Sequence, residues 1–469
     1  MNKDFAGIRP PNDRHAPFID FLAAGFKISI GRSISKEGQT ITKDQLPRAY
    51  VINMGANGLA VARTLGRVGV PVVGIDSRPD APGFASKFVS KLVAKDPRED
   101  PDALLQALLQ AGEGQEQKGI IFPASDAAVR FLSQNEKGLS ERFLFLTPPE
   151  KVREAMVNKR LQHDEAVRLG IPVPDTIFPA GPDDLKEVED TIRFPAFIKP
   201  LYSHKWCTTF ANKGCIVTTS EELQEKMATV FASGHEVMVQ SIIWPPGRDL
   251  YSVGAFFDEH GNESPSFCWH KLRQYPPSFG VGSLVESAHQ HEVMDLGLRF
   301  MKGIGYRGIG YVEFKKDQQD GEWKMVEMNA RTGQTNALQS KAGRPLVLYQ
   351  YDHLIGRPSP EVRDYPDGVL WWDSLNDIDS FWRLRRRGEI TLFQWLRSCI
   401  QVDVNAYFDI NDPAPLFVRY GYGSKLARLM NDLLRMKIDE DRVPTPDATG
   451  SQVRKKIAYG PDSTRTNLR

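Results

Sequence analysis

The sequence of 469 residues predicts an α/β fold in its N-terminal part, an α+β fold in the part that follows, and a C-terminal extension. Three observations support this prediction. A buried strand, a glycine turn and a helix follow one another from about Ala49, which is the order of a β-α-β unit. Proline and glycine punctuation near residue 150 then marks a change of pattern. Farther on, two acidic strands, Tyr311–Phe314 and Met325–Arg331, alternate with the period of a β-sheet.

The first unit predicts a Rossmann-like domain. Its elements are a strand, a turn, a helix and a second strand: Tyr50–Met54, Gly55–Gly58, Leu59–Val68 and Val70–Asp76. The turn is Gly-x-x-Gly rather than the full G-x-G-x-x-G fingerprint, and Asp76 lies at a suitable distance to hold a ribose hydroxyl. NAD(P) binding is therefore an alternative, although a lone glycine-rich turn is a weak signal for it.

A later unit of the same kind carries the loop Pro123–Asp126, which follows the expected strand Gly119–Phe122. Parallel sheets bind ligands at the carboxyl ends of their strands. We therefore expect this loop to contribute to a substrate cleft.

Composition and charge exclude several classes of protein. Hydrophobic residues make up 41% and charged residues 25% of the chain, and the formal net charge is +1, so no global field attracts nucleic acid. The 4 cysteines lack C-x-x-C spacing, which is typical of a reducing compartment. No apolar run reaches the roughly 18 residues of a transmembrane helix. We expect a cytoplasmic protein without a transmembrane segment.

The two acidic strands predict a hairpin with a polar face. Asp320-Gly321 supplies a turn signal between them. Alternation places Glu313 on one face of the first strand, and Glu327, Asn329 and Arg331 in a row on the second. Oxygen ligands of this kind suit Mg²⁺ bound to phosphates, and an adjacent arginine suits a phosphoryl group. A solvated charged ribbon is the alternative for each of these residues taken alone.

The hairpin, together with motifs upstream, resembles the ATP-grasp superfamily over roughly residues 49 to 356. Lys159 stands in an N-K-x-x-x-x-x-x-A pattern, Lys199 ends the strand F-I-K-P, and Val237–Gln240 resembles the hinge along the adenine. The family often has Glu where this chain has Gln240. The resemblance assigns ATP binding to five residues: Lys159, Lys199, Gln240, Ile243 and Asp249.

A second signature resembles the carboxylate–amine ligase branch of that superfamily. It reads Lys271-Leu-Arg273-Gln-Tyr-Pro-Pro277 and precedes a glycine-containing loop. An exposed basic strand is the alternative. The chain departs from the family at Tyr202–Trp206, where a glycine-rich lid is usual and no glycine occurs before Gly214.

The resemblance implies an ATP-dependent ligase that forms an amide through an acyl phosphate and releases ADP. It implies Mg²⁺, with Mn²⁺ as an alternative, held by Glu313, Glu327 and Asn329, and catalytic roles for Arg331, Arg273 and Lys271. The expected partners are ATP, a carboxylate and an amine: an amino acid, a sugar acid or a small cyclic metabolite. A degenerate ATP-binding regulator and an NAD(P)-dependent oxidoreductase are the alternative functions.

These motifs predict four regions. Residues 1–47 form an N-terminal extension and residues 48–150 a Rossmann-like domain that precedes the ATP-grasp domain. Residues 151–355 form the two-lobed ATP-grasp domain, with its hinge near 237–243, and residues 356–469 a C-terminal region with a loosely ordered tail. No motif in the sequence selects either substrate or an oligomeric state.

Overall fold

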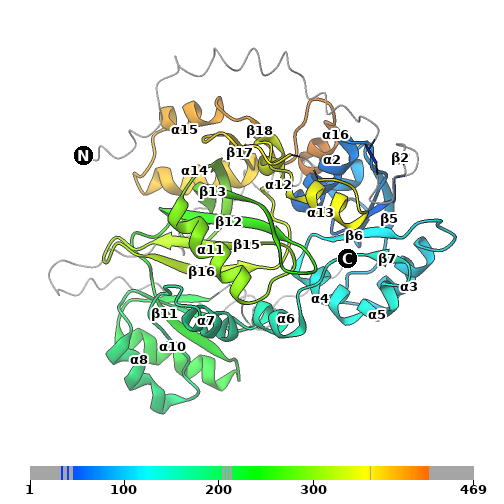
Figure 1. Ribbon diagram of the computed structural model, residues 1–469. Helices are drawn as coiled ribbons and strands as arrows, with labels where there is room; N and C mark the ends of the chain where they lie inside the picture. Colours follow the sequence, from blue (N-terminus) through cyan, green and yellow to red (C-terminus); the bar gives the residue numbers. More distant parts are fainter. Residues whose placement is uncertain are drawn as a thin grey trace.

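The computed structural model describes residues 33–34, 40–41, 46–202, 206, 210, 214–359 and 361–421 (Figure 1). Most of the predicted N-terminal extension and all of the polar tail lie outside these residues, as does most of the atypical lid. The described part of the extension includes β1 (Ser33–Ile34) and β2 (Thr40–Ile41), which pair with each other. Three larger sheets organise the rest of the described chain.

The first of these is the predicted parallel sheet. Its strands run in the order β5-β4-β3-β6-β7, and every pairing is parallel. The strands are β3 (Ala49–Ile52), β4 (Val72–Asp76), β5 (Val89–Val93), β6 (Gly119–Pro123) and β7 (Phe143–Leu144). The helices and the short 3₁₀ turn η3 are α2 (Ala56–Arg67), η3 (Pro82–Ala85), α3 (Pro101–Ala111), α4 (Asp126–Gln134) and α5 (Glu136–Leu139).

The glycine turn after β3 has a packing role. A Cβ atom on Gly58 would lie 2.0 Å from the carbonyl oxygen of Asn53, so α2 approaches the strand end as closely as it does only with glycine there. Asn53 itself has φ of 82°, and its side-chain oxygen accepts a hydrogen bond from the Gly55 amide at 3.3 Å. The second glycine of the Gly-x-x-Gly pattern is thus explained by helix–strand packing.

The second sheet belongs to a small lobe and is antiparallel, in the order β10-β9-β11-β8. Two helices, α6 (Glu150–Val157) and α7 (Lys159–Arg168), lead into it from the parallel sheet. Its strands are β8 (Thr176–Ile177), β9 (Ala196–Pro200), β10 (Cys215–Val217) and β11 (Val237–Ser241). It also contains η4 (Pro182–Asp184), α8 (Leu185–Thr191) and α10 (Ser220–Ala232).

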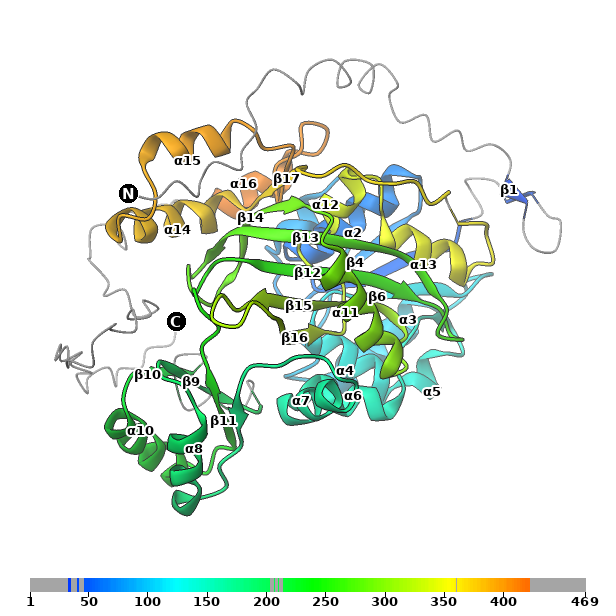
Figure 2. The ribbon, with the colours of Figure 1, turned by 60° about the vertical axis from the view of Figure 1, so that its left-hand side comes forward.

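The third sheet is the largest and lies between the small lobe and the C-terminal helices (Figure 2). Its order is β16-β15-β12-β13-β14-β17-β18. The strands are β12 (Leu250–Phe257), β13 (Glu263–Tyr275), β14 (Val281–Ser287), β15 (Gly308–Lys316), β16 (Trp323–Asn329), β17 (Leu370–Trp372) and β18 (Val404–Asn405). The helices of this part of the chain are α11 (His291–Gly303), α12 (Asn336–Lys341), α13 (Leu346–Leu354), α14 (Ser374–Arg386), α15 (Leu392–Cys399) and α16 (Ala414–Tyr420).

The C-terminal region contacts both the large sheet and the parallel-sheet domain. Its strands β17 and β18 extend the large sheet, because β17 pairs with β14. Farther on, Asp412 reaches the parallel-sheet domain and forms a buried ion pair with Arg63 of α2 at 2.9 Å. The same carboxylate accepts a hydrogen bond from Ser86 at 2.7 Å. The helix α16 packs against η3 of the parallel-sheet domain, so this segment links the two larger sheets.

The predicted α/β and α+β fold class is confirmed. The predicted hairpin is β15–β16, in which Glu313 lies opposite Glu327 and Tyr311 opposite Asn329. Within the residues that the structure describes, no helix combines the length and the apolar character needed to cross a membrane.

Candidate active site

The two facing carboxylates form the centre of the candidate site. Glu313 and Glu327 are cross-strand neighbours, and both are largely withdrawn from solvent. Lys271, on β13, donates to both Glu313 oxygens at 2.8 Å. Burial raises the pKa of Glu313, with Lys271 opposing the shift and Glu327 adding to it.

Three lysines control the second carboxylate. Burial opposes ionisation of Glu327, but the positive charges of Lys159, Lys199 and Lys271 outweigh burial and hold its pKa below the ordinary value. The cluster thus contains three ammonium groups and two carboxyl groups in a largely buried space. A polyanion with a divalent cation is the kind of ligand that such a mixed set can neutralise.

Lys199 connects two strands of the small lobe. It lies on β9 and donates to the side-chain oxygen of Gln240 on β11 at 2.8 Å, while Gln240 donates in turn to Thr176 at 2.9 Å. Burial, reinforced by repulsion from Lys159, lowers the pKa of Lys199 to about 8. A neutral amide therefore holds this buried ammonium group in the hinge region that the sequence predicted.

Arg331 connects the hairpin to the parallel-sheet domain. Its guanidinium donates to both oxygens of Asp126, at 2.8 and 3.2 Å, and to Asn329 at 3.3 Å. Burial disfavours its charge, but Tyr311 and Asp126 more than compensate and raise the pKa of Arg331. Asp126 ends the loop for which the sequence predicted a place in a cleft, and the structure brings that loop to Arg331.

Arg273 lies in a different environment from Lys271, two residues earlier on the same strand. Its guanidinium makes two bonds of 2.8 Å to Asp377 on α14, and Asp377 also accepts from Ser283 and Trp395. Asp377 is fully buried. In the structure, Arg273 therefore connects the large sheet to α14. Its predicted catalytic role stays a prediction.

The remaining two predicted residues lie in the segment that joins β11 to β12. Ile243 is buried, with 8% of its surface exposed. Asp249 has φ of 53°, its carboxylate accepts from Gln318 at 3.1 Å, and its carbonyl accepts from the Lys316 amide at 3.1 Å. The hairpin tip thus holds Asp249 in place, and its predicted contact with ribose stays untested.

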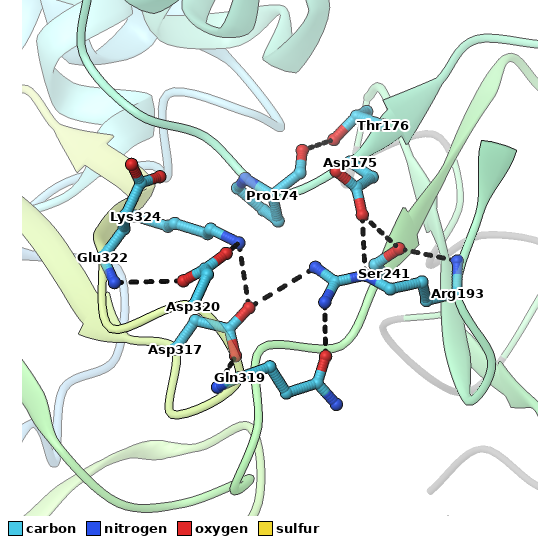
Figure 3. A network of polar contacts seen from close by, with 10 residues as sticks. All are labelled: Pro174, Asp175, Thr176, Arg193, Ser241, Asp317, Gln319, Asp320, Glu322 and Lys324. Atoms are coloured by element: carbon cyan, nitrogen blue, oxygen red, sulfur yellow. Dashed lines mark hydrogen bonds and ion pairs between the residues drawn. The ribbon is translucent and has the colours of Figure 1, made fainter.

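A second polar network lies at the tip of the same hairpin (Figure 3). Asp317 accepts from Lys324 at 2.9 Å and forms an ion pair with Arg193 of the small lobe at 3.5 Å. Arg193 also pairs with Asp175 at 2.9 Å and donates to Gln319. We call this set the hairpin-tip network. It fixes the tip of the large sheet to the small lobe.

Among the residues of these contacts that the sequence patterns do not single out are Thr176, Arg193, Tyr311 and Asp377. Each acts through a partner at least 18 residues away in the chain. Asp377 lies in a region without a recognised motif, so only its fully buried position, visible in the structure, identifies it.

The fold and the cluster are similar to those of ATP-grasp proteins. The family model described as the carbamoyl-phosphate synthase L chain, ATP binding domain, matches residues 282–357. Among solved structures, N5-carboxyaminoimidazole ribonucleotide synthetase in an ADP complex aligns with a TM-score of 0.53 at 15% identity, over 69% of this chain and 81% of that one. L-amino acid ligase from Bacillus licheniformis aligns with a TM-score of 0.52 at 16% identity, over 67% of this chain and 75% of that one.

Sequence relatives agree with the fold. D-aspartate ligase of Enterococcus faecium is 22% identical over 53% of this chain and 62% of its own length. The carbamoyl phosphate synthase large chain of Pyrococcus furiosus is 22% identical over 55% of this chain and 25% of its own length. The matches thus span less than two thirds of these relatives. The predicted resemblance to the ATP-grasp superfamily and its carboxylate–amine ligase branch is confirmed.

Proposed function

We propose that this chain is an ATP-dependent carboxylate–amine ligase that works through an acyl phosphate and releases ADP. The observation that carries the proposal is the position of Glu327, a partly buried carboxylate opposite Glu313 and within the field of three lysines. Such a concentration of buried charge is costly unless a ligand uses it.

The residues present fit a magnesium–nucleotide complex. The oxygen donors would be Glu313, Glu327 and Asn329, and Mg²⁺ favours oxygen ligands, part of which it takes from phosphates and water. No cluster of three or more His, Cys, Asp or Glu side chains suited to a metal occurs among the described residues. A site of two carboxylates and an amide, completed by the nucleotide, agrees with that finding. When bound, Mg²⁺ would neutralise charge on the phosphates.

The chain's own groups would then act on the two reacting molecules. Lys159 and Lys199 would hold the phosphates, and Gln240 would read the adenine edge. The substrate carboxylate oxygen attacks the γ-phosphorus, and ADP departs. The amine then attacks the acyl carbon, phosphate departs, and the amine gives up a proton to form the neutral amide. Lys271 and Arg331, which border the carboxylates, would stabilise negative charge in both steps.

The substrates that we propose are an amino acid, a sugar acid or a small cyclic metabolite as the partners of the new amide. Two of the similar proteins are named as amino-acid ligases, D-aspartate ligase and L-amino acid ligase. A degenerate regulator is less consistent with the site, because both carboxylates and the lysines around them are retained.

The test is ADP release, screened with panels of carboxylates and amines. Glu327→Gln should lower ADP release by at least about a hundredfold, because it removes a charge aimed at the metal and phosphates. Its melting temperature should stay within a few degrees of the unsubstituted chain. Glu322→Gln is the matched control, since Glu322 is exposed on the same hairpin. Wild-type ADP release by the Glu327 variant would overturn the assignment.

A further inference from the structure

A group of exposed apolar side chains lies on α15, outside the lysine–carboxylate cluster. Phe393 and Ile400 are 75% and 84% exposed. Leu392 and Leu396 are 50% and 48% exposed. Single exposed apolar residues are ordinary on a protein surface, but a contiguous group of large ones indicates an interaction surface.

The four side chains share one face of the helix. Leu392, Leu396 and Ile400 follow one another at intervals of four residues, and Phe393 comes directly after Leu392. With 3.6 residues per turn, all four fall within roughly 100° of the helix circumference. We call this surface the apolar face of α15.

A different face attaches α15 to the rest of the molecule. The ring of Trp395 stacks on that of Phe381 on α14, with the ring centres 4.6 Å apart, and its Nε1 atom donates to Asp377 at 2.9 Å. Figures 1 and 2 show α15 on the outside of α14, at the edge of the molecule. The apolar face is therefore presented on the outer surface.

Arginines lie next to the apolar face. Arg397 comes four residues after Phe393, so it borders this face along the helix. The last turn of α14 contains Arg385 and Arg386, and both are exposed. From Trp382 to Ile400 the chain carries five arginines and one glutamate, a net charge of +4, whereas the whole chain has +1. The basic charge is therefore concentrated at this corner.

Charge and apolar surface together select the kind of partner. A second copy of this chain, placed on the same face across a two-fold axis, would bring two basic surfaces together, which costs free energy. An anionic bilayer matches both features, because its headgroups attract arginine and its acyl chains accept side chains made only of hydrocarbon. Trp382, 41% exposed and four residues before Arg386, is of the type enriched at headgroup level.

We propose that the apolar face of α15 and the arginine-rich end of α14 bind the surface of a membrane that contains anionic lipids. Phe393 and Ile400 enter the boundary between headgroups and acyl chains, and Arg385 and Arg397 contact the headgroups. The inference goes beyond the proposed function and does not rest on it.

The membrane-binding surface is connected to the candidate active site. Asp377, which accepts from Trp395, also accepts two bonds of 2.8 Å from Arg273 on β13. Lys271 lies two residues earlier on the same strand and donates to Glu313. Binding of α15 to a membrane would therefore set the orientation of the candidate active site relative to the lipid surface.

Binding can be measured without ATP, by sedimentation of the full chain with lipid vesicles. One set of vesicles contains phosphatidylcholine alone, and the other contains equal parts of phosphatidylcholine and phosphatidylglycerol. The unsubstituted chain should bind the anionic vesicles at least about tenfold more tightly, and added salt should reduce that preference. Failure to sediment with either set would overturn the proposal.

Two double variants separate the apolar and the ionic contributions. Phe393→Gln with Ile400→Gln should weaken binding to the anionic vesicles at least about tenfold, because less apolar surface leaves water. Arg385→Gln with Arg397→Gln should also weaken that binding about tenfold and reduce the preference for phosphatidylglycerol. Binding by the Phe393/Ile400 variant equal to that of the unsubstituted chain would contradict the proposal.

Phe417→Gln with Ile410→Gln is the matched control. These residues are 65% and 82% exposed, and Phe417 lies on α16, which packs against η3 of the parallel-sheet domain. This variant should bind the vesicles as the unsubstituted chain does. An equal loss of binding in the control would mean nonspecific adsorption of exposed apolar residues and would overturn the proposal.

Two measurements without vesicles complete the test. The melting temperatures of all the variants should stay within a few degrees of that of the unsubstituted chain, because the substituted side chains lie at the surface. Sedimentation velocity reports the oligomeric state. A dimer that dissociates in the Phe393/Ile400 variant would assign the apolar face to a second copy of the chain and overturn the membrane assignment. ADP release is measured separately, so failure of the ligase proposal would be seen independently.

Discussion

The two ends of the β15–β16 hairpin hold their charges in different ways. In the candidate active site, Lys271 pairs directly with Glu313, but two further charges contact neutral amides: Lys199 donates to Gln240, and Glu327 accepts from Asn329 at 3.5 Å. At the hairpin tip, Asp317 is paired directly with Lys324 and Arg193. Both ends are polar and both join lobes of the molecule.

The difference indicates a binding role for the candidate active site and a structural role for the hairpin tip. Charges that neutralise one another at the tip have little left for a ligand, and they stabilise the arrangement of the lobes. A charged group that is hydrogen-bonded to a neutral amide is not neutralised, so its electrostatic field can act on a bound polyanion. Substitutions at each end of the hairpin test this comparison.

Removing Lys199 from the candidate active site should have the largest effect on ATP binding. Lys199→Met should weaken ATP binding by about a hundredfold or more, because a buried ammonium group facing phosphate is lost. It should also raise the free energy of unfolding at pH 7. Lowering the pKa from 10.5 to about 8 corresponds to roughly 3 kcal/mol, the net cost of burial and of repulsion from Lys159. The bond to Gln240 is lost as well, so a net gain of about 1–2 kcal/mol is expected.

Calorimetry with ATP and denaturant unfolding would measure the two effects. The sign follows from the lowered pKa: the burial cost is complete below about pH 8 and fades towards pH 10.5. The stability gain of Lys199→Met should therefore shrink over that interval. A variant that is less stable at pH 7 would contradict the view that this lysine is held at a cost.

Titration of the same lysine should have the next largest effect. The value of kcat/KM for ATP should fall about tenfold per pH unit above pH 8, because it reports the protonation of the free enzyme. Lys199→Arg, which stays charged, should flatten that limb of the profile. A rate that is unchanged up to pH 10 would argue that Lys199 does not meet the nucleotide.

Breaking the hairpin-tip network should have the smallest effect on activity. Asp317→Asn should lower the free energy of unfolding by about 1–3 kcal/mol, because it leaves Lys324 and Arg193 with a weaker partner at a buried position. We expect kcat to change less than about threefold. Asp320→Asn is the milder control, since Asp320 pairs with Lys324 at a more exposed place. A hundredfold loss of kcat in Asp317→Asn would mean that the tip takes part in chemistry.

The local features of the site could be predicted from the sequence. Strand alternation and the Asp320-Gly321 turn were sufficient to predict that Glu313 and Glu327 face each other, because a hairpin is a short-range structure. Motif resemblance similarly identified Lys199 and Gln240, which the structure brings into contact across two strands.

Long-range partners could not be predicted in this way. Arg331 and Asp126 are 205 residues apart, and Arg273 and Asp377 are 104 apart. Nothing in the local pattern distinguishes Lys271 from Arg273. Lys271 donates to Glu313 in the candidate active site, whereas Arg273 pairs with Asp377 of α14. That distinction depends on how distant elements pack, so only the structure supplies it.

The buried pair between Arg63 and Asp412 has a consequence for engineering. A chimera that took the C-terminal region from a relative would leave the α2 guanidinium enclosed with a foreign partner. The exchangeable unit is therefore not a contiguous stretch of chain. It consists of the C-terminal region together with α2 and the η3 loop. A chimera that exchanges all of these keeps the ion pair between Arg63 and Asp412.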